Sequence, residues 1–458
     1  MYKPSNLLIF LIIISAFSIK SKELSMITVP LKVIHNGFEK YPISNETHFI
    51  YEKEEKVQTI FGERIRKLKE EKHGTVKKLE STLFAAEITI GRTQTFDVVL
   101  DTGSVNLWVA GINSNDTAEI RRHYDPDKSE TKSKTSETFE VEYGTGKSAG
   151  VYYTDLISFI TSETHDIKFG VASQTYFDVE GADGIMGLAR HYSDKQFSKI
   201  WMMASKGAIS SKSFSFKFIS EESVEMYLGD EHSDFQQENN TVQCKLLNDG
   251  TYQKLLWTCR LYQFGLYSKS NITKNATTSC GYPFLFDTGS NVMMLPLETL
   301  EQLANDLSRF NCRKYYNTED KDYRIACEDK NNLPNFMIEV GDHFILLDSS
   351  EMYYMNKDDN GNIEYVFKIT FQKNLPIALI GQPFFKLFHT KFDYENKVLK
   401  FYSEDQSNFI FTTTKPDEKE PISWEYILIA VAVAFAALLV LCCICRCIRK
   451  MCCLKQKH

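Results

Sequence analysis

Alternating hydrophobic and polar residues recur in short runs through the middle of the 458-residue chain. Turn-forming residues separate these runs, a pattern typical of β-strands. The clearest runs cover residues 86–90, 96–99, 138–143, 151–159 and 365–371. The middle of the chain is therefore predicted to be mostly β.

Two stretches carry a helical pattern instead. Leucines recur at three- and four-residue spacing over residues 297–307, directly after Pro296, which suits a first helical position. A weaker pattern of the same kind covers residues 193–204. We expect two amphipathic helices that pack on the β core.

Longer apolar runs occur near both ends of the chain. Residues 7–17 form one after Lys3, too short to span a bilayer, which indicates a signal peptide over residues 1–20. Residues 426–445 carry no charge and would cover about 30 Å as a helix, the thickness of a hydrocarbon core. Basic residues follow directly, which places the C-terminus in the cytosol. The sequence thus predicts a single-pass type I membrane protein of the secretory or endolysosomal (vacuolar) system or the cell surface, with its large part luminal or extracellular.

The cysteines divide between the two sides of the predicted membrane helix. The five on the luminal side are expected to form disulfides, and their odd number leaves at least one without an intramolecular partner. The pairing of Cys244, Cys259 and Cys280 does not follow from the sequence. The six near the cytosolic membrane edge favour S-acylation over a zinc site, because no histidine stands at ligand spacing.

Five acceptor sequences for N-glycosylation suit a luminal surface. They lie at Asn45, Asn115, Asn239, Asn271 and Asn275.

The charge is unevenly distributed. The formal net charge of -7 disfavours nucleic acid as a partner, because phosphate binding needs a clustered basic surface. Residues 21–79 are nevertheless basic, whereas residues 80–420 are strongly acidic. Two such segments would attract at neutral pH and separate when carboxylates become protonated. A role of the acidic charge in solubility explains the composition of residues 80–420 equally well.

One tetrapeptide, Asp-Thr-Gly-Ser, occurs twice, each time after an apolar triplet. A second feature, two apolar residues followed by glycine, repeats together with the tetrapeptide. Its glycine is Gly187 in the first half, 86 residues after Asp101, and Gly381 in the second half, 94 residues after Asp287. Similar spacing in both halves predicts two lobes of one topology, each presenting one aspartate. The two copies are Asp101, Thr102, Gly103 and Ser104, and Asp287, Thr288, Gly289 and Ser290.

A buried pair of aspartates has a definite chemistry. Like charges a few ångströms apart in a medium of low dielectric constant do not both ionise, so the pair shares one proton. The ionised member can take a proton from water while the protonated member donates to a carbonyl oxygen. Water then attacks a peptide bond without a covalent enzyme intermediate.

These motifs together resemble the pepsin-like aspartic proteases, of the pepsin and cathepsin D type, over about residues 80–402. Asp101 and Asp287 correspond to the catalytic pair, and Trp108 to the tryptophan that follows the first motif. Tyr143, Gly144 and Thr145 resemble the flap that closes over substrate. Gln382 departs from the family pattern, which has an acidic residue there.

The resemblance implies a mostly β, bilobal fold with a cleft that holds an extended polypeptide. It also implies a disulfide between Cys312 and Cys327, no cofactor or metal, a monomer, and a propeptide that acts as inhibitor. The basic segment from Val29 to Lys78 is helix-prone and fits such a propeptide. The alternative function is that of a pepsin-like binding or adhesion protein that has lost its catalytic activity.

The expected organisation follows from these observations. It comprises a signal peptide (1–20), a basic propeptide (21–79), an N-terminal lobe (80–235), a C-terminal lobe (236–411), a stalk (412–424), a transmembrane helix (425–445) and a cytosolic tail (446–458).

Overall fold

The structure is a computed structural model of the full chain, and it describes residues 27–38 and most of residues 79–411. The chain divides into two units, Met1–Thr413 and Thr414–His458, and the described residues all belong to the first. The predicted signal peptide, stalk, transmembrane helix and cytosolic tail lie outside the described residues. Within 79–411 the residues not described are 117–119, 121, 144–145, 160–161, 177–180, 191–198, 221–222, 230–231, 249–254, 268–275, 280, 308–309, 319–321, 342, 358–361 and 376.

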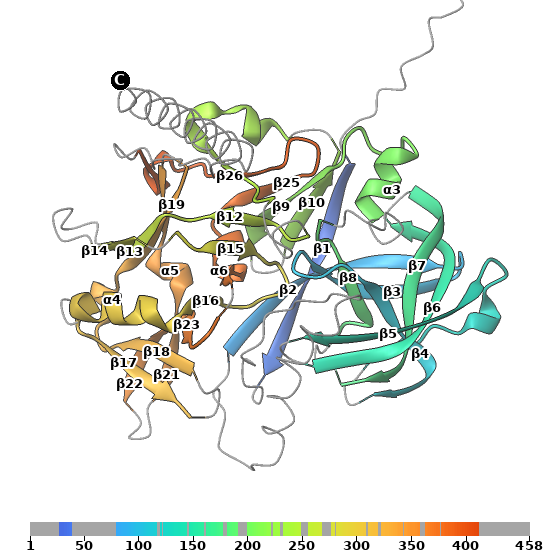
Figure 1. The fold of residues 1–458 in the computed structure, drawn as a ribbon, viewed down its shortest axis with the longest axis horizontal. Coiled ribbons are helices and arrows are strands. Elements are labelled where there is room, and N and C mark those ends of the chain that lie inside the picture. Colours follow the sequence, from blue (N-terminus) through green and yellow to red (C-terminus); the bar gives the residue numbers. More distant parts are fainter. Residues whose placement is uncertain are drawn as a thin grey trace, which may run out of the picture. The chain divides into compact units, whose positions relative to one another are not determined.

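The largest sheet of the described residues has 13 strands and draws them from both halves of the chain. Their order is β11-β26-β25-β9-β10-β1-β2-β3-β8-β4-β7-β6-β5. Figure 1 shows β9, β10 and β25 between the strands of the first half on the right and those of the second half on the left. The bounds are β1 Ile27–Phe38, β2 Leu79–Ile90, β3 Gln94–Asp101, β4 Leu107–Asp116, β5 Ser133–Tyr143, β6 Gly146–Phe159, β7 Ser162–Thr175, β8 Gly184–Gly187, β9 Ser213–Ser220, β10 Ser223–Leu228, β11 Thr241–Lys245, β25 His389–Asp393 and β26 Val398–Tyr402.

Two further sheets of the described part belong to the second half, with nine and five strands. The strands of the nine-stranded sheet are β12 Thr258–Arg260, β15 Pro283–Phe286, β16 Met293–Pro296, β17 Cys312–Asn317, β18 Asp322–Cys327, β21 Tyr353–Lys357, β22 Ile363–Phe367, β23 Ile369–Gln372 and β24 Ala378–Ile380. Those of the five-stranded sheet are β13 Gln263–Tyr267, β14 Ala276–Ser279, β19 Asn335–Val340, β20 His343–Leu347 and β27 Phe409–Phe411. The prediction of a mostly β protein is confirmed.

Helices are few and short in the described residues. The predicted helix at residues 297–307 is present as α4, and Leu300 and Leu303 are buried on its inner face. Of the second predicted helix, the structure describes the part from Lys199 to Ser205, which is α3. Residues 191–198 are not among the described residues. The remaining helices are α5 Ser349–Met352 and α6 Gln382–Phe385, with 3-10 turns η1 Pro126–Lys128, η3 Ser233–Gln236, η4 Glu238–Asn240, η7 Lys330–Asn332 and η8 Gln406–Asn408.

One predicted strand is divided. The apolar run at residues 365–371 forms two strands, β22 and β23, which are interrupted at Lys368. The Lys368 N–H donates to Met352 O at 2.7 Å, and its carbonyl accepts from Met293 N at 3.0 Å. The backbone there is bonded to two other segments, so a single uninterrupted strand was the wrong prediction.

The repeat predicted from the sequence appears as a repeated pairing of strands. In the first half β3 lies parallel to β8, so that Asp101 stands beside Gly187. In the second half β15 lies parallel to β24, and Phe286 stands beside Ile380. Both aspartates therefore occupy the same place, at the end of a strand that pairs with the apolar-apolar-glycine segment.

The predicted propeptide (residues 21–79, the leader) contains a strand in its described part, whereas the sequence pattern predicts a helix-prone segment. Residues 27–38 form β1, which pairs antiparallel with β10 and with β2. Val29, Leu31 and Val33 alternate along it, a period of two that suits a strand between two partners. The leader thus begins as a central strand of the 13-stranded sheet.

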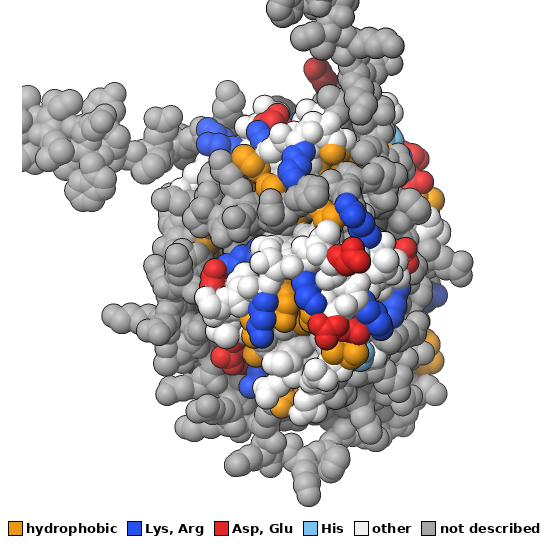
Figure 2. Space-filling model, turned by 90° about the vertical axis from the view of Figure 1, so that its right-hand side faces the viewer, with side chains coloured by type: hydrophobic (Ala, Val, Ile, Leu, Met, Phe, Trp, Pro, Cys, Tyr) orange, Lys and Arg blue, Asp and Glu red, His pale blue; other side chains and the backbone are white. Residues whose placement is uncertain are grey.

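Other surface features bear on the sequence predictions. On the face drawn in Figure 2, acidic and basic side chains are interspersed and no broad patch of one sign stands out. Among the described residues, none of the helices combines the length and apolar character needed to cross a bilayer.

Candidate active site

The two repeated aspartates are brought together from opposite halves of the chain. Asp101 ends β3 and Asp287 follows β15, and both side chains are buried, with 1% and 0% of their surface exposed. A parallel neighbour holds each segment: Leu188 N donates to Asp101 O at 2.7 Å, and Asp287 N donates to Ile380 O at 2.9 Å. The site is thus built from two equivalent strand ends.

The glycines of the repeat let the two segments approach closely. A Cβ added to Gly103 would lie 2.7 Å from the Asp287 carboxylate, and one added to Gly289 would lie 2.6 Å from Asp101 Oδ1. Neither distance is possible for a real side chain, so each glycine is required by the carboxylate of the other half. Each also donates its N–H to the aspartate two residues before it, at 2.8 Å in both halves.

The threonines of the repeat tie the two segments to each other. Thr102 Oγ1 donates to Phe286 O at 2.8 Å, and Thr288 Oγ1 donates to Leu100 O at 2.6 Å. Each hydroxyl therefore reaches the carbonyl just before the aspartate of the opposite half. These bonds fix the separation of the two carboxylates.

The serines of the repeat lie in the same buried region but make different contacts. Ser290 Oγ donates to Val292 O at 3.0 Å, and the Ser104 carbonyl accepts from Ala189 N at 2.9 Å. Gln382 Nε2 donates to Thr288 O at 2.6 Å, so the residue that departs from the family pattern supports the second motif.

The two aspartates interact strongly with each other. Burial raises the pKa of Asp287 well above its ordinary value, and the neighbouring Asp101 raises it further, by its charge and by a shared hydrogen bond. N–H groups of Gly289 and Gly103 act in the opposite direction but are outweighed. Asp287 Oδ2 is buried and accepts no hydrogen bond from a described N–H or hydroxyl group. This arrangement favours one proton on Asp287.

Tyr143 lies at the tip of the hairpin formed by β5 and β6. Its hydroxyl accepts a hydrogen bond of 2.7 Å from Trp108 Nε1, and both side chains are buried. Burial raises the pKa of Tyr143 well above its ordinary value, and the charge of Asp101 adds to this. Gly144 and Thr145, the other predicted flap residues, lie outside the described residues.

Two disulfides are present in the described residues. Cys312 pairs with Cys327, as the resemblance implied, across the neighbouring strands β17 and β18. Cys244 pairs with Cys259 and joins β11 to β12, a pairing that the sequence did not provide. Cys280 lies outside the described residues.

The predicted glycosylation acceptors are only partly covered by the described residues. Asn115, near the end of β4, and Asn239, in η4, are both exposed. Asn45, Asn271 and Asn275 lie outside the described residues. Glycosylation itself stays a prediction.

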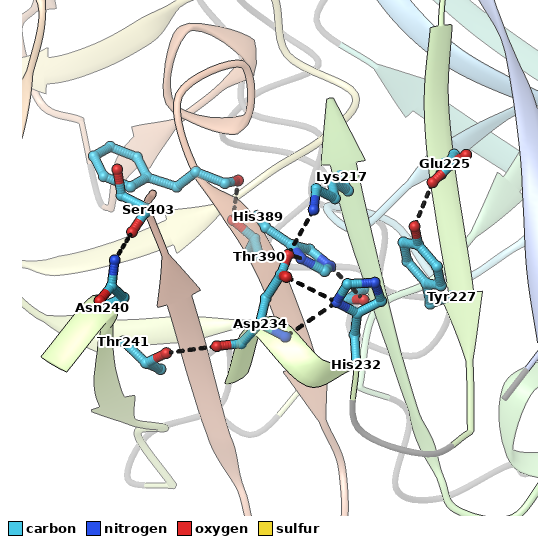
Figure 3. Close-up of polar contacts among 12 residues, drawn as sticks. Lys217, Glu225, Tyr227, His232, Asp234, Asn240, Thr241, His389, Thr390 and Ser403 are labelled. Carbon is cyan, nitrogen blue, oxygen red and sulfur yellow. Dashed lines mark hydrogen bonds and ion pairs between the residues drawn. The ribbon is translucent and has the colours of Figure 1, made fainter. Parts of the chain in front are cut away.

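Among the residues that the structure describes, one cluster of metal-ligand residue types is made of His232, Asp234 and His389 (Figure 3). Lys217 Nζ and His389 Nδ1 each lie 2.8 Å from Asp234 Oδ2, and His232 Nδ1 accepts the N–H of Asp234 at 3.2 Å. The lone pairs that a cation needs are thus already engaged, and an ammonium group lies against the carboxylate. The arrangement suits charge pairing better than metal binding.

The same cluster shifts two pKa values. Burial opposes the charge of Asp234, but hydrogen bonds from His389 and Lys217 prevail and lower its pKa far below the usual range. Burial lowers the pKa of His389 to about 4, although Asp234 acts in the opposite direction. Sequence reasoning missed this cluster, because Asp234 and His389 are 155 residues apart.

Comparison with known proteins agrees with this geometry. The family model described as "Eukaryotic aspartyl protease" matches residues 83–403. Gastricsin of Oryctolagus cuniculus is 26% identical over 338 residues, 69% of this chain and 80% of the relative. Pregnancy-associated glycoprotein 2 of Bos taurus is 27% identical (69% and 81% covered), and pepsin A of Gallus gallus is 25% identical (68% and 81% covered).

Proposed function

Because the chain belongs to the eukaryotic aspartyl protease family, we propose that it is an aspartic endopeptidase in which Asp101 and Asp287 activate water. The observation that carries this proposal is the reciprocal contact of the two motifs, in which each glycine abuts the carboxylate of the other half. A protein that only binds its ligand has no need to hold two carboxylates this close together.

The pair shares one proton before the reaction, and the raised pKa of Asp287 supports placing that proton on Asp287. Asp287 holds it and donates it to the carbonyl oxygen of the scissile peptide bond, while ionised Asp101 removes a proton from water. The resulting hydroxide adds to the carbonyl carbon and forms a neutral diol. Collapse of the diol breaks the C–N bond, the amine leaves with a proton from Asp101, and the diol returns one to Asp287.

The substrate is an extended polypeptide between the two lobes, covered by the hairpin that carries Tyr143. Trp108 Nε1 donates to the Tyr143 hydroxyl, which keeps the Tyr143 side chain in one position. The buried surroundings of the aspartates exclude bulk water, which strengthens each electrostatic interaction there.

The leader acts as a propeptide that inhibits the enzyme until it is removed. Strand β1 occupies a central position between β10 and β2, so its departure exposes two strand edges and requires the sheet to rearrange. The leader is basic and residues 80–420 are acidic, and acid weakens the attraction between opposite charges by protonating carboxylates. A purified precursor that cleaved peptides equally fast at neutral and acidic pH would contradict this role.

The proposed location rests on the sequence alone. A signal peptide at residues 1–20 and a membrane helix at residues 425–445 make the protein a single-pass type I enzyme with its catalytic part outside the cytosol. Full-length protein should stay in the pellet after alkaline carbonate extraction, and a chain ending at Thr413 should be released. Release of both forms would contradict the anchor.

The activity itself is tested with the processed enzyme and a library of peptides at acidic pH. Mass spectrometry should find internal cleavage by the parent and none by Asp101→Asn or Asp287→Asn. Equal amounts of product from the parent and both variants would show that the aspartates do not catalyse the cleavage. The alternative of a binding protein without catalytic activity would then remain.

A further inference from the structure

A buried arginine lies where the two halves of the molecule meet behind the aspartates. Arg190 directly follows the segment that pairs with Asp101, and only 1% of its surface is exposed. Its guanidinium group points across to the second half of the chain: Nη1 donates to Leu247 O at 3.1 Å, and Nη2 donates to Asn248 Oδ1 at 2.7 Å. An arginine in the interior is held by several hydrogen bonds because its charge is otherwise strongly disfavoured there.

The same guanidinium group also contacts the segment beside β15. Nη1 lies 3.4 Å from Leu256 O, and the group stands 6.0 Å from the ring of Trp257. Trp257 donates its Nε1–H back to Leu188 O at 2.7 Å. Arg190 therefore donates from the segment after β8 to the segment before β12, and Trp257 donates from the segment before β12 back to the segment after β8.

Both ends of this link are bonded to the catalytic strands. On one side, Leu188 N donates to Asp101 O at 2.7 Å. On the other side, Phe286 N donates to Trp257 O at 3.0 Å, immediately before Asp287. A continuous set of hydrogen bonds, made by backbone groups and by the side chains of Arg190 and Trp257, thus connects the segments of the two aspartates.

We infer that Arg190 is a positioning residue for the reaction, one that fixes how the two halves are set against each other and hence the distance between the carboxylates. This inference rests on the proposed function. The threonines hold the two motifs together directly, whereas Arg190 holds the segments behind them and resists rotation of one half against the other. Small displacements of catalytic groups have large effects on rate, because proton transfer requires that the donor and acceptor atoms be close and aligned.

The consequence is specific to the shared proton. If the carboxylates move apart, they interact less, and the two apparent pKa values of the pair converge. The basic limb of the pH–rate profile then moves towards acid, and the acidic limb moves towards neutral pH. Loss of stability alone would reduce the amount of active enzyme without narrowing the profile.

The test compares Arg190→Met with the parent, at equal concentrations of titrated active sites. We expect kcat to fall at least about tenfold with little change in KM, together with a narrower pH profile. Arg190→Lys should show a partial effect, because one ammonium group cannot reach all three acceptors. Asn248→Ala, which removes one exposed partner, serves as the milder variant should Arg190→Met fail to fold, and it should narrow the profile in the same direction.

Lys199→Met is the matched control. Lys199 is also a buried cation of the first half, and its Nζ donates to Ile157 O at 2.6 Å. It should leave kcat and the width of the profile unchanged. The inference is overturned if Arg190→Met keeps the parental kcat and profile, or if Lys199→Met narrows the profile equally. Parental activity that is lost in Asp287→Asn upholds the proposed function in either case.

Discussion

Thr102 and Thr288 exchange hydrogen bonds although they stand 186 residues apart in the sequence. The N–H of Thr102 donates to Thr288 Oγ1 at 3.1 Å, and the N–H of Thr288 donates to Thr102 Oγ1 at 2.9 Å. Each hydroxyl thus accepts from the opposite backbone and donates to a carbonyl of the same opposite segment. This two-fold symmetric contact joins the two halves of the molecule directly beside the aspartates.

Removing one hydroxyl should therefore leave a buried N–H and a buried carbonyl without partners. Thr102→Val should lower the free energy of unfolding by about 2–6 kcal/mol, because each of the two orphaned groups costs about 1–3 kcal/mol. Thr102→Ser keeps the hydroxyl and should retain most of the stability and activity. Denaturant unfolding and peptide hydrolysis check both variants, and a Val variant as stable and active as the Ser variant would refute the role of the hydroxyl.

The hydrogen bond between Trp108 and Tyr143 should control the position of the hairpin over the aspartates. Trp108→Phe removes the donor but keeps an aromatic ring, so kcat/KM should fall by about tenfold while the aspartates stay in place. Tyr143→Phe should have a similar effect. The double variant should be no worse than either single one, because both changes remove the same interaction.

Fully additive losses in that double-mutant cycle would mean that the two side chains act independently. Tyr315→Phe is a suitable control, since Tyr315 belongs to β17 in the second half, away from the hairpin. It should leave kcat/KM unchanged.

The buried His389 predicts how stability depends on pH. Its pKa in the folded protein is lowered to about 4 from an ordinary value of 6.5. The unfolded chain therefore binds the proton first as the pH falls, and stability that is present above pH 6.5 is lost as the pH falls through about 4. The loss attributable to this residue should approach about 3 kcal/mol.

Chemical denaturation of the precursor, in an Asp287→Asn background that prevents self-cleavage, measures this loss between pH 7 and pH 4. His389→Asn should be less stable at neutral pH and should show a flatter dependence on pH over this interval. His343→Asn, which alters a less buried histidine of β20, should keep the parental slope. An unchanged slope in His389→Asn would contradict the assignment.

The sequence predicts those features that depend on neighbouring residues. The repeated motif, the hairpin ending at Tyr143 and the helix α4 are visible because their hydrophobic periodicity or their turn residues are local. The leader strand β1 was missed because its stability comes from β10, almost 200 residues away, and not from its own propensity. Arg190 and the cluster around Asp234 were missed for the same reason, since only the folded chain brings their partners together.

The pH–rate profile of the processed enzyme tests the shared proton most directly. The account predicts a bell-shaped dependence of kcat/KM, with an acidic limb for the ionised aspartate and a basic limb for the protonated one. Asp287→Asn, which cannot exchange that proton, should abolish hydrolysis at every pH. Hydrolysis by Asp287→Asn at the parental rate, or a parental profile without a basic limb, would contradict it.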